Sequence, residues 1–267
     1  MTMLAADSYT ARRMDPIEFK TNTFGGVLPE PKALPGPEEI RARLAYSLDV
    51  WRNEGYQAVW LEIPLDQAYV VPAAAEAGFE YHHANSGYVM MTRKLEENTF
   101  LPLYATHYIG AGGVVINRNE ELLVVREKRD GQASGSFKLP GGHILEGEHL
   151  AQGVVREVLE ETGIESRFIS LVGFRHQHGY RHGKSDIYFI CRLEALSEKI
   201  TLQQDQIAEA AWIPVADYLS SESASVFNRS VVEAAVNDPP LQSTFIEGYR
   251  DPSTCLLYTS PSPRDRG

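Results

Sequence analysis

Residues 142–164 read GHILEGEHLAQGVVREVLEETGI, and this stretch decides the fold. Aliphatic side chains recur at helical spacing from residue 150 to residue 159, which predicts a helix from about His149 to Thr162. Gly163 follows the last turn, where glycine commonly ends a helix. A glycine pair, Gly141 and Gly142, precedes the helix and lets a backbone carbonyl or a diphosphate approach closely.

Three glutamates crowd one side of this predicted helix. Glu157, Glu160 and Glu161 lie at positions i, i+3 and i+4, so their carboxylates border the apolar stripe. Like charges at this spacing repel one another, and Arg156 supplies only one compensating charge. Hard divalent cations such as Mg²⁺ bind carboxylate oxygens and complete their coordination with water and substrate phosphates. The pattern indicates a divalent-metal site, with a solvated acidic face as the alternative.

The spacing of this stretch resembles the signature of the Nudix hydrolases, G-x5-E-x7-R-E-U-x-E-E-x-G-U with U aliphatic. Every fixed position is matched, by Gly142, Glu148, Arg156, Glu157, Val158, Glu160, Glu161, Gly163 and Ile164. The resemblance implies an α/β fold, with a Nudix α/β/α sandwich in the C-terminal part of the chain. It also implies that a metal-activated water attacks one phosphorus of a nucleoside diphosphate linked to another group.

The resemblance also implies roles for individual residues. The three helix glutamates are expected to bind Mg²⁺, or alternatively Mn²⁺, and Gly141 to add a carbonyl ligand. Glu148 is expected to assist the metal site or to pair with Arg156, which orients a catalytic glutamate. Glu157 is the expected general base; a late-loop base is the alternative, and there the chain offers Asp205 and Glu209 without a matching motif.

Cations and aromatic side chains flank the signature on both sides. Within FRHQH, residues 174–178, the pattern resembles that of plant-type Nudix hydrolases. The residues expected to bind substrate are Arg126, Lys138, Phe174, Arg175 and Gln177. A surface role is the alternative for each cation alone. The stretch GAGGVV from Gly110 lacks the third glycine and the following helix of a dinucleotide-binding fingerprint, so we do not interpret it as one.

Segments outside the signature carry the resemblance further. GYQAVWLEIP (55–64) and GKSDIYFICRL (183–193) resemble the plant Nudix hydrolases that cleave ADP-ribose and NADH, and the animal Nudix protein encoded antisense to a fibroblast growth factor gene. Such relatives carry an N-terminal pre-Nudix domain with an acetyltransferase-like fold. We therefore expect this small α/β domain at 19–96, a linker at 97–106 and the Nudix domain at 107–250. The N-terminal domain lacks the glycine-rich loop by which such folds bind acetyl-CoA. We therefore expect it to serve as a scaffold or in dimerisation, and we expect the protein to form a homodimer.

Periodicity predicts the remaining elements. In the first domain a helix is expected from Pro37 to Gly55 and another from Asp66, as N-cap, to Ala77, with a possible kink at Pro72. Its strands are expected at 57–63, 79–83 and 88–93. In the second domain, strands are expected at 109–116, 122–126, 168–174, 186–193 and up to Pro214, with a turn at 117–120, a Gly/Ser loop before Phe137 and short helices after Pro214 and Ser225.

Composition excludes several classes of partner. The 267 residues include 25 Lys and Arg against 36 Asp and Glu, a formal net charge of −11. Bulk nucleic acid is therefore not expected as a partner, because it is bound mainly through Lys and Arg. No apolar run approaches the ~20 residues that span a bilayer, so no membrane partner is expected. The two cysteines, Cys191 and Cys255, are too few for a disulfide framework and favour a cytoplasmic location.

Both ends of the sequence are expected to lie outside the fold. Residues 1–18 are interpreted as disordered or as a misannotated start, with Met14 as an alternative first residue. Residues 255–265 read CLLYTSPSPRD and resemble the translation of an adapter used to prepare DNA sequencing libraries. We therefore expect 251–267 to be a tail that does not belong to the natural protein, with a disordered Ser/Pro-rich segment as the alternative.

The functional hypothesis is a Mg²⁺-dependent pyrophosphatase that cleaves ADP-ribose or NADH to AMP and a phosphorylated product. Two alternatives stay open. One is a catalytically weak regulatory protein that uses the pocket to bind a nucleotide. The other is a CoA pyrophosphatase, although the additional upstream motif of that group is absent.

Overall fold

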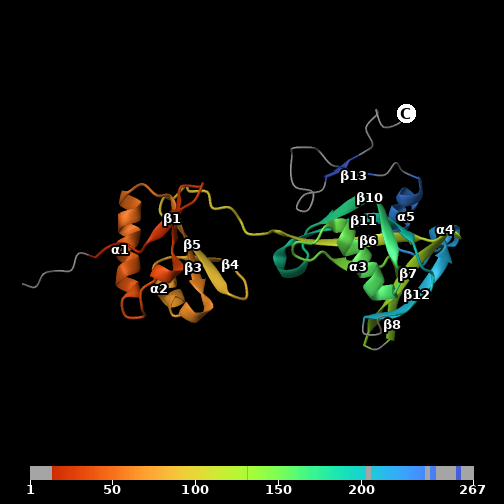
Figure 1. The fold of residues 1–267 in the computed structure, drawn as a ribbon, viewed down its shortest axis with the longest axis horizontal. Helices are drawn as coiled ribbons and strands as arrows, with labels where there is room; N and C mark the ends of the chain where they lie inside the picture. Colours follow the sequence, from red (N-terminus) through yellow and green to blue (C-terminus); the bar gives the residue numbers. More distant parts are fainter. Residues whose placement is uncertain (1–13, 131, 203–205, 238–240, 245–256, 260–267) are drawn as a thin grey trace, which may run out of the picture. The chain divides into compact units, whose positions relative to one another are not determined.

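The computed structural model describes residues 14–130, 132–202, 206–237, 241–244 and 257–259 (Figure 1). Contacts divide the chain into two compact units, Met1–Ala105 and Thr106–Gly267. The change from one unit to the next lies at the end of the segment expected to be a linker, residues 97–106.

The N-terminal unit is a five-stranded sheet with two α-helices. The strand order is β1-β2-β3-β5-β4, and only β2 and β3 pair in parallel. The strands are β1 (Phe19–Thr21), β2 (Gly26–Pro29), β3 (Ala58–Pro64), β4 (Glu80–Ala84) and β5 (Tyr88–Lys94). The helical segments are η1 (Pro31–Ala33), α1 (Ile40–Asn53), η2 (Leu65–Gln67) and α2 (Val70–Glu76). Helix α1 buries Leu44, Leu48 and Trp51 in the core, as their helical spacing predicted.

The predicted start of the second helix at Asp66 is wrong. Asp66 lies in the short 3-10 segment η2, and α2 begins at Val70 after Tyr69, which makes no side-chain cap. Pro72 consequently falls in the first turn of α2. There the backbone N–H groups have no intrahelical acceptor, so a proline removes no hydrogen bond. A proline in this position favours a helix start rather than the kink that the sequence suggested.

The C-terminal unit is built on a seven-stranded mixed sheet. The main path is β10-β11-β6-β7-β12, with β8 paired to β7 and β9 paired to β6. Strands β11 and β6 run parallel, and the other pairs are antiparallel. The strands are β6 (His107–Ile116), β7 (Glu121–Arg129), β8 (Gln132–Lys138), β9 (Gly141–His143), β10 (Ser166–Gln177), β11 (Ser185–Ala195) and β12 (Ile207–Pro214). The helical segments are α3 (Leu150–Thr162), η3 (Arg181–Gly183), α4 (Val215–Ser220) and α5 (Val226–Asn237).

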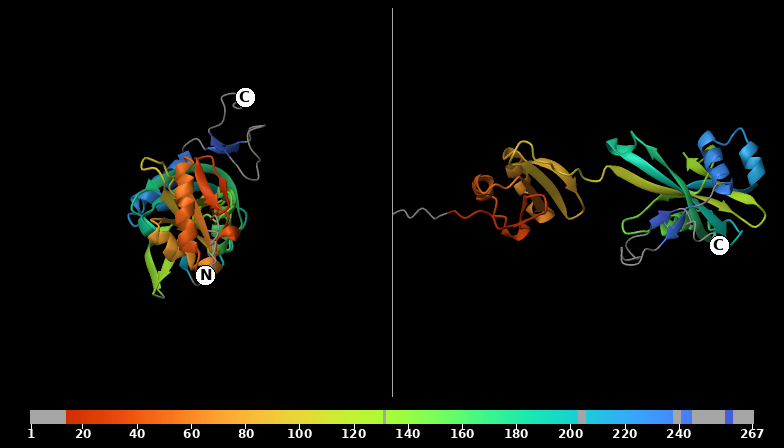
Figure 2. Two further views of the ribbon diagram at one scale, coloured as in Figure 1. Left: turned by 90° about the vertical axis from the view of Figure 1, so that its left-hand side faces the viewer. Right: turned by 90° about the horizontal axis from the view of Figure 1, so that it is seen from above.

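Helices cover both faces of this sheet and so form the expected α/β/α sandwich. Figure 2 shows α3 on one side of the sheet and α4 and α5 on the other. Val158 of α3 packs in one core cluster with Val115 of β6. Val232 of α5 packs in the other cluster with Val114, the neighbouring residue of the same strand. Successive strand residues point to opposite faces, so the continuous apolar run of β6 fills both layers.

Strands β8 and β9, which extend the main sheet of the C-terminal unit, were not predicted. The Gly/Ser-rich segment before Phe137 was expected to be a loop, but Gln132–Lys138 forms β8 against β7. Its polar composition hid the strand, because the pairing depends on the backbone groups that β7 offers along its edge. Strand β9, Gly141–His143, pairs in the same way with Gly110–Gly112 of β6.

The ends of the chain require one correction. Residues 1–13 lie outside the described part, but Ile17 is fully buried in the N-terminal core and donates a backbone hydrogen bond to Ser47 Oγ at 2.9 Å. The folded unit therefore begins before residue 19. Most of the suspected adapter segment also lies outside the described residues; within it, Leu257–Thr259 forms β14, which pairs with β13 (Gln242–Thr244). In the described chain, no helix combines the length and apolarity needed to cross a membrane.

Substituting Gly163 is expected to destabilise the C-terminal unit. Gly163 has φ 70°, and an added Cβ would lie 2.9 Å from Thr201 Cβ and 3.0 Å from the Thr201 carbonyl oxygen. Gly147 has φ 76° with no atom within 4 Å of an added Cβ, so it provides a matched control. We expect Gly147→Ala to cost about 1 kcal/mol from backbone strain alone, and Gly163→Ala at least about 1 kcal/mol more, in urea unfolding. Equal losses would mean that the Thr201 contact relaxes freely.

Candidate active site

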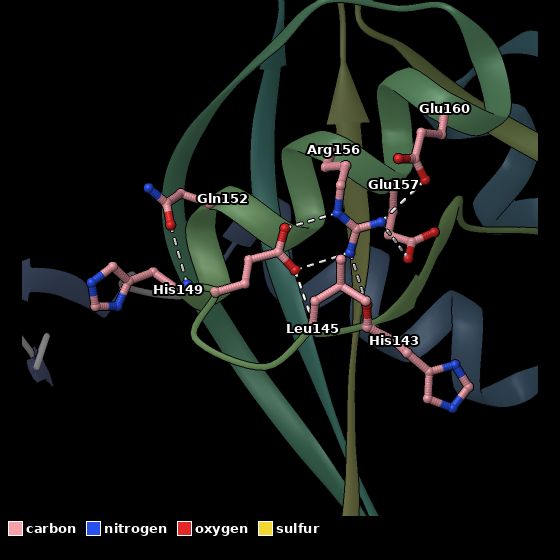
Figure 3. A network of polar contacts seen from close by, with 8 residues as sticks. His143, Leu145, His149, Gln152, Arg156, Glu157 and Glu160 are labelled. Carbon is pink, nitrogen blue, oxygen red and sulfur yellow. Dashed lines mark hydrogen bonds and ion pairs between the residues drawn. The ribbon is translucent and has the colours of Figure 1, made fainter. Parts of the chain in front are cut away.

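The signature segment folds as a loop that leads into helix α3. His149 is the N-cap, and its backbone N–H donates to the side-chain oxygen of Gln152 at 3.2 Å (Figure 3). At the other end Gly163 donates to the carbonyl of Leu159 at 2.8 Å. Both ends of the helix are thus closed by residues of the signature segment, and this fixes the direction in which its glutamates point.

Arg156 ties the loop to the helix. Its Nε and Nη2 donate to the two carboxylate oxygens of Glu148 at 2.8 and 2.9 Å, a bidentate pair. Its Nη1 donates to Glu157 at 2.9 Å and to Glu160 at 3.1 Å, and Nη2 also reaches the carbonyl of His143 at 3.0 Å (Figure 3). The pairing with Arg156 holds the pKa of Glu148 below its usual value. Of the two roles expected for Glu148, the structure shows the pairing with arginine.

Glu161 is the buried member of the acidic group. Its side chain accepts a hydrogen bond from the Gly141 backbone N–H at 2.9 Å, and the residue is only 7% exposed. Burial raises the pKa of Glu161 to about 7, and the negative charge of Glu157 adds to the effect. A carboxylate in this position is therefore charged at neutral pH only at a cost, which a bound cation would remove.

The acidic helix borders a cavity of about 700 Å³. This volume lies within the range of ~300–1,000 Å³ that is usual for small-molecule sites. The sequence-predicted residues that line it are Lys138, Gly141, Glu157, Glu160, Glu161 and Arg175. Metal-binding and phosphate-binding candidates from both sides of the signature therefore meet in one space.

Three of the predicted substrate-binding residues do not line the cavity. Arg126 pairs with Glu209 at 3.2 Å, and its guanidinium lies 4.2 Å from the centre of the Phe137 ring. Both of its interactions are thus with neighbours in the C-terminal unit. The pairing also occupies Glu209, the late acid considered as an alternative base, while Asp205 lies outside the described residues.

The other two lie on β10 beside Arg175. Phe174 is 65% exposed and packs against Phe189, with ring centres 5.8 Å apart. Because strand residues alternate, Phe174 points to the face opposite that of Arg175. Gln177 shares the face of Arg175 but falls at the end of the strand, beyond the residues that line the cavity. Strand alternation, applied to the sequence of β10, would have assigned Phe174 and Arg175 to opposite faces of the sheet.

Several cavity residues were missed because they come from distant segments. They are Asp186 and Tyr188 of β11, Gln206, and Phe227 and Asn228 of α5. The alternation of Asp186 and Tyr188 in β11 was a usable signal, since both follow one face of a strand. Tyr188 also explains the GAGGVV stretch: a Cβ on Gly110 or Gly112 would lie 2.9 or 2.6 Å from its side chain. Close packing against Tyr188 thus accounts for these two glycines without a dinucleotide-binding fingerprint.

The donor chemistry of the cavity fits a divalent cation. Arg156 engages one oxygen of Glu157 and one of Glu160, and Glu161 is held by Gly141 N–H. Among the described residues no three His, Cys, Asp or Glu side chains already converge as a coordination sphere. The carboxylates nevertheless border the same cavity, and hard cations prefer such oxygens. Glu157, Glu160 and Glu161 are the residues that could hold the ion.

Comparison with known proteins shows which family has this architecture. Profiles described as the Nudix hydrolase domain and the NUDIX domain match residues 17–95 and 106–235. Nudix hydrolase 2 of Arabidopsis thaliana is 38% identical over 74% of this chain and 72% of its own length. The chain belongs to the Nudix hydrolase family. This membership confirms the family inferred from the signature and, with it, the α/β fold class.

Two further relatives of this Nudix hydrolase show how far the likeness extends. Nudix hydrolase 8 of Arabidopsis thaliana is 44% identical over 73% of the chain, which spans about half, 54%, of that relative. The human protein named nucleoside diphosphate-linked moiety X motif 6 is 34% identical over 78% of the chain and 68% of its own length. In each case the similarity extends over more of the chain than the NUDIX domain alone.

Proposed function

We propose that this Nudix hydrolase is a Mg²⁺-dependent diphosphatase that cleaves a nucleoside diphosphate linked to another moiety. ADP-ribose and NADH are the proposed substrates, with AMP and a phosphorylated partner as products. The observation that supports the proposal is the placement of Glu157, Glu160 and Glu161 on one cavity together with Lys138 and Arg175. Carboxylates for a metal ion and cations for phosphate oxygens are the two requirements of this reaction.

The residues of the signature would divide the work. A bound Mg²⁺, or Mn²⁺, lowers the pKa of a water molecule and neutralises charge on phosphate oxygens. Glu157, Glu160 and Glu161 would hold the ion, and the carbonyl of Gly141 would add a further ligand. Glu157 would accept the proton of the attacking water, and Arg156 would keep its carboxylate in place through the hydrogen bond of 2.9 Å.

A substrate panel tests this proposal. Purified protein is incubated with ADP-ribose, NADH, CoA and FAD in Mg²⁺, in Mn²⁺ and in EDTA. We expect hydrolysis of ADP-ribose or NADH to AMP with either metal and none in EDTA. Inactivity on the whole panel contradicts the proposal. Tight ADP-ribose binding without turnover would support the regulatory alternative, and a preference for CoA would support the CoA pyrophosphatase.

We also infer that the N-terminal unit is an acetyltransferase-like scaffold and that the protein forms a cytoplasmic homodimer. The N-terminal unit has a hydrophobic core of its own, in which Trp51 and Leu44 are fully buried. A separate core of this kind supports a structural role for the unit. Light scattering after size-exclusion chromatography measures the mass directly. A monomer of 29.8 kDa at micromolar concentration would contradict the homodimer.

The buried Glu161 predicts a stability that depends on both pH and metal. Its pKa is raised in the fold from 4.5 to about 7, so the stabilisation by its neutral form is complete below about pH 4.5 and is lost as pH rises from there to about 7. The difference between the ordinary and the folded pKa of Glu161 corresponds to a loss of about 3 kcal/mol in the free energy of unfolding. Mg²⁺ binds the charged form, and we expect it to raise Tm more at pH 8 than at pH 5.5.

The measurement is thermal unfolding with and without Mg²⁺ at both pH values. Glu161→Gln is the control, because an amide does not titrate, and it should remove the pH-dependent part of the Mg²⁺ effect. The same Tm increase at pH 5.5 and pH 8 in the unmodified protein would contradict a role for Glu161 at the metal site.

A further inference from the structure

A second charged group of the cavity comes from strands β10 and β11 rather than from the acidic helix. Asp186 of β11 is 4% exposed, and its carboxylate accepts a hydrogen bond from Arg175 Nη2 at 2.7 Å. The pair is diagonal across neighbouring antiparallel strands, since Arg175 is in register with Tyr188 and Gln177 with Asp186. Both members of the pair line the cavity. A buried carboxylate requires such a partner, so the sheet itself fixes the pair.

Aromatic rings of β11 and α5 also contact the guanidinium of Arg175. Its central carbon lies 5.4 Å from the ring centre of Tyr188 and 5.4 Å from that of Phe227 in α5. Tyr188 itself packs closely over Gly110 and Gly112, where an added Cβ would lie 2.9 or 2.6 Å from its side chain. Cation–π contacts at this distance favour a fixed, partly desolvated guanidinium. Arg175 is therefore positioned before any ligand arrives.

The Arg175 guanidinium retains donors that Asp186 does not use. Arginine carries five N–H groups, and the ion pair with Asp186 takes one of them. Among the described residues Arg175 Nε is buried and has no hydrogen-bond partner. By contrast, Lys138, another cation of the cavity, already forms an ion pair with Glu127. Arg175 is thus a preorganised donor for oxygen atoms of an anionic ligand.

We propose that Asp186 is a positioning residue that fixes Arg175 as a phosphate anchor, and that this anchor selects diphosphates over monophosphates. This inference rests on the proposed function, in which a metal ion at the helix glutamates binds one phosphate. Arg175 then binds the second phosphate through its unused N–H groups, because arginine binds phosphate oxygens by charge-assisted hydrogen bonds. A ligand with two linked phosphates uses both points, whereas a monophosphate uses one.

Calorimetric binding of ADP and AMP in Mg²⁺ tests the anchor without requiring turnover. We expect the unmodified protein to bind ADP at least about 10-fold more tightly than AMP. Arg175→Lys keeps the charge but loses the fixed fork, and it should weaken ADP binding about 10-fold or more and AMP binding less than about 3-fold. Asp186→Asn should produce the same selective loss, and Asp186→Glu should restore part of it. In the double variant the losses should not add, because both changes remove one unit.

A matched control lies on the same two strands. Arg167 of β10 forms an ion pair with Glu194 of β11, and neither residue lines the cavity. Glu194→Gln should leave both affinities unchanged. The proposal is overturned if the unmodified protein does not distinguish ADP from AMP, or if Arg175→Lys weakens both ligands equally. It is also overturned if Asp186→Asn binds ADP as tightly as the unmodified protein.

The outcome separates this inference from the proposed function. Selective loss of ADP binding in a protein that hydrolyses nothing on the panel would support the anchor and reject the diphosphatase. If the unmodified protein hydrolyses ADP-ribose but its Arg175→Lys variant still prefers ADP to AMP, the diphosphatase is supported and the anchor is rejected.

Discussion

Replacing Glu157 by Gln is expected to lower kcat for ADP-ribose hydrolysis by at least about a thousandfold, which corresponds to about 4 kcal/mol of transition-state stabilisation. The amide cannot accept the proton of the attacking water and is a weaker ligand for a hard cation. Its shape should be tolerated, since glutamine fills the same space against Gly142, where an added Cβ would lie 2.5 Å from Glu157 Oε2. Steady-state kinetics with saturating Mg²⁺ measure the loss, and KM should change far less than kcat.

The control for this variant is Glu165→Gln. Glu165 is exposed, follows the end of the same helix and does not line the cavity. We expect its kcat to stay within about twofold of that of the unmodified protein, as for surface substitutions away from a site. If the Glu157→Gln variant retained a tenth or more of the activity, Glu157 could be neither the general base nor an essential metal ligand.

Replacing Arg156 by Met is expected to cost about 2–4 kcal/mol of folding stability, because it leaves partly buried carboxylates without their cation. The side chains of Glu148 and Glu157 are only 14% and 16% exposed, and both are hydrogen-bonded to this arginine. Urea unfolding of the C-terminal unit measures the loss. Activity should fall as well, since Arg156 also holds Glu157 and Glu160, two of the proposed metal ligands.

Two comparisons make this result interpretable. Arg167→Met removes an exposed ion pair in the same unit, and we expect it to cost less than about 1 kcal/mol. Combining Arg156→Met with Glu148→Gln should cost less than the sum of the single changes, because one isolated charge is removed. If Arg156→Met lowered the folding stability as little as Arg167→Met, water would screen the charges of Arg156 and its glutamate partners.

Local sequence was sufficient for the acidic helix. The apolar spacing predicted α3 to within a residue, and Gly163 has the positive φ of 70° expected of a glycine cap. The turn at 117–120 also lies where it was expected, between β6 and β7. Each of these features depends on residues a few positions apart, whose interactions form whatever the remainder of the chain does.

Elements that depend on partners were predicted less well. Asp66 had the right residue type for an N-cap, but α2 begins four residues later. Strand β8 has a loop-like composition and exists because β7 extends beside it as far as Arg129. In both cases tertiary packing outweighed local preference.

The amino-acid sequence by itself determined the family, the helix with its three glutamates and the glycine loop before it, because these lie within 24 consecutive residues, 141–164. Tertiary structure alone decided which distant side chains share the cavity. It brought Asp186, Tyr188 and Phe227 to Arg175, and it turned Phe174 away from the same residue. The physical reason is strand pairing: the register of β10 against β11 sets which residues face one another, and no local pattern encodes that register.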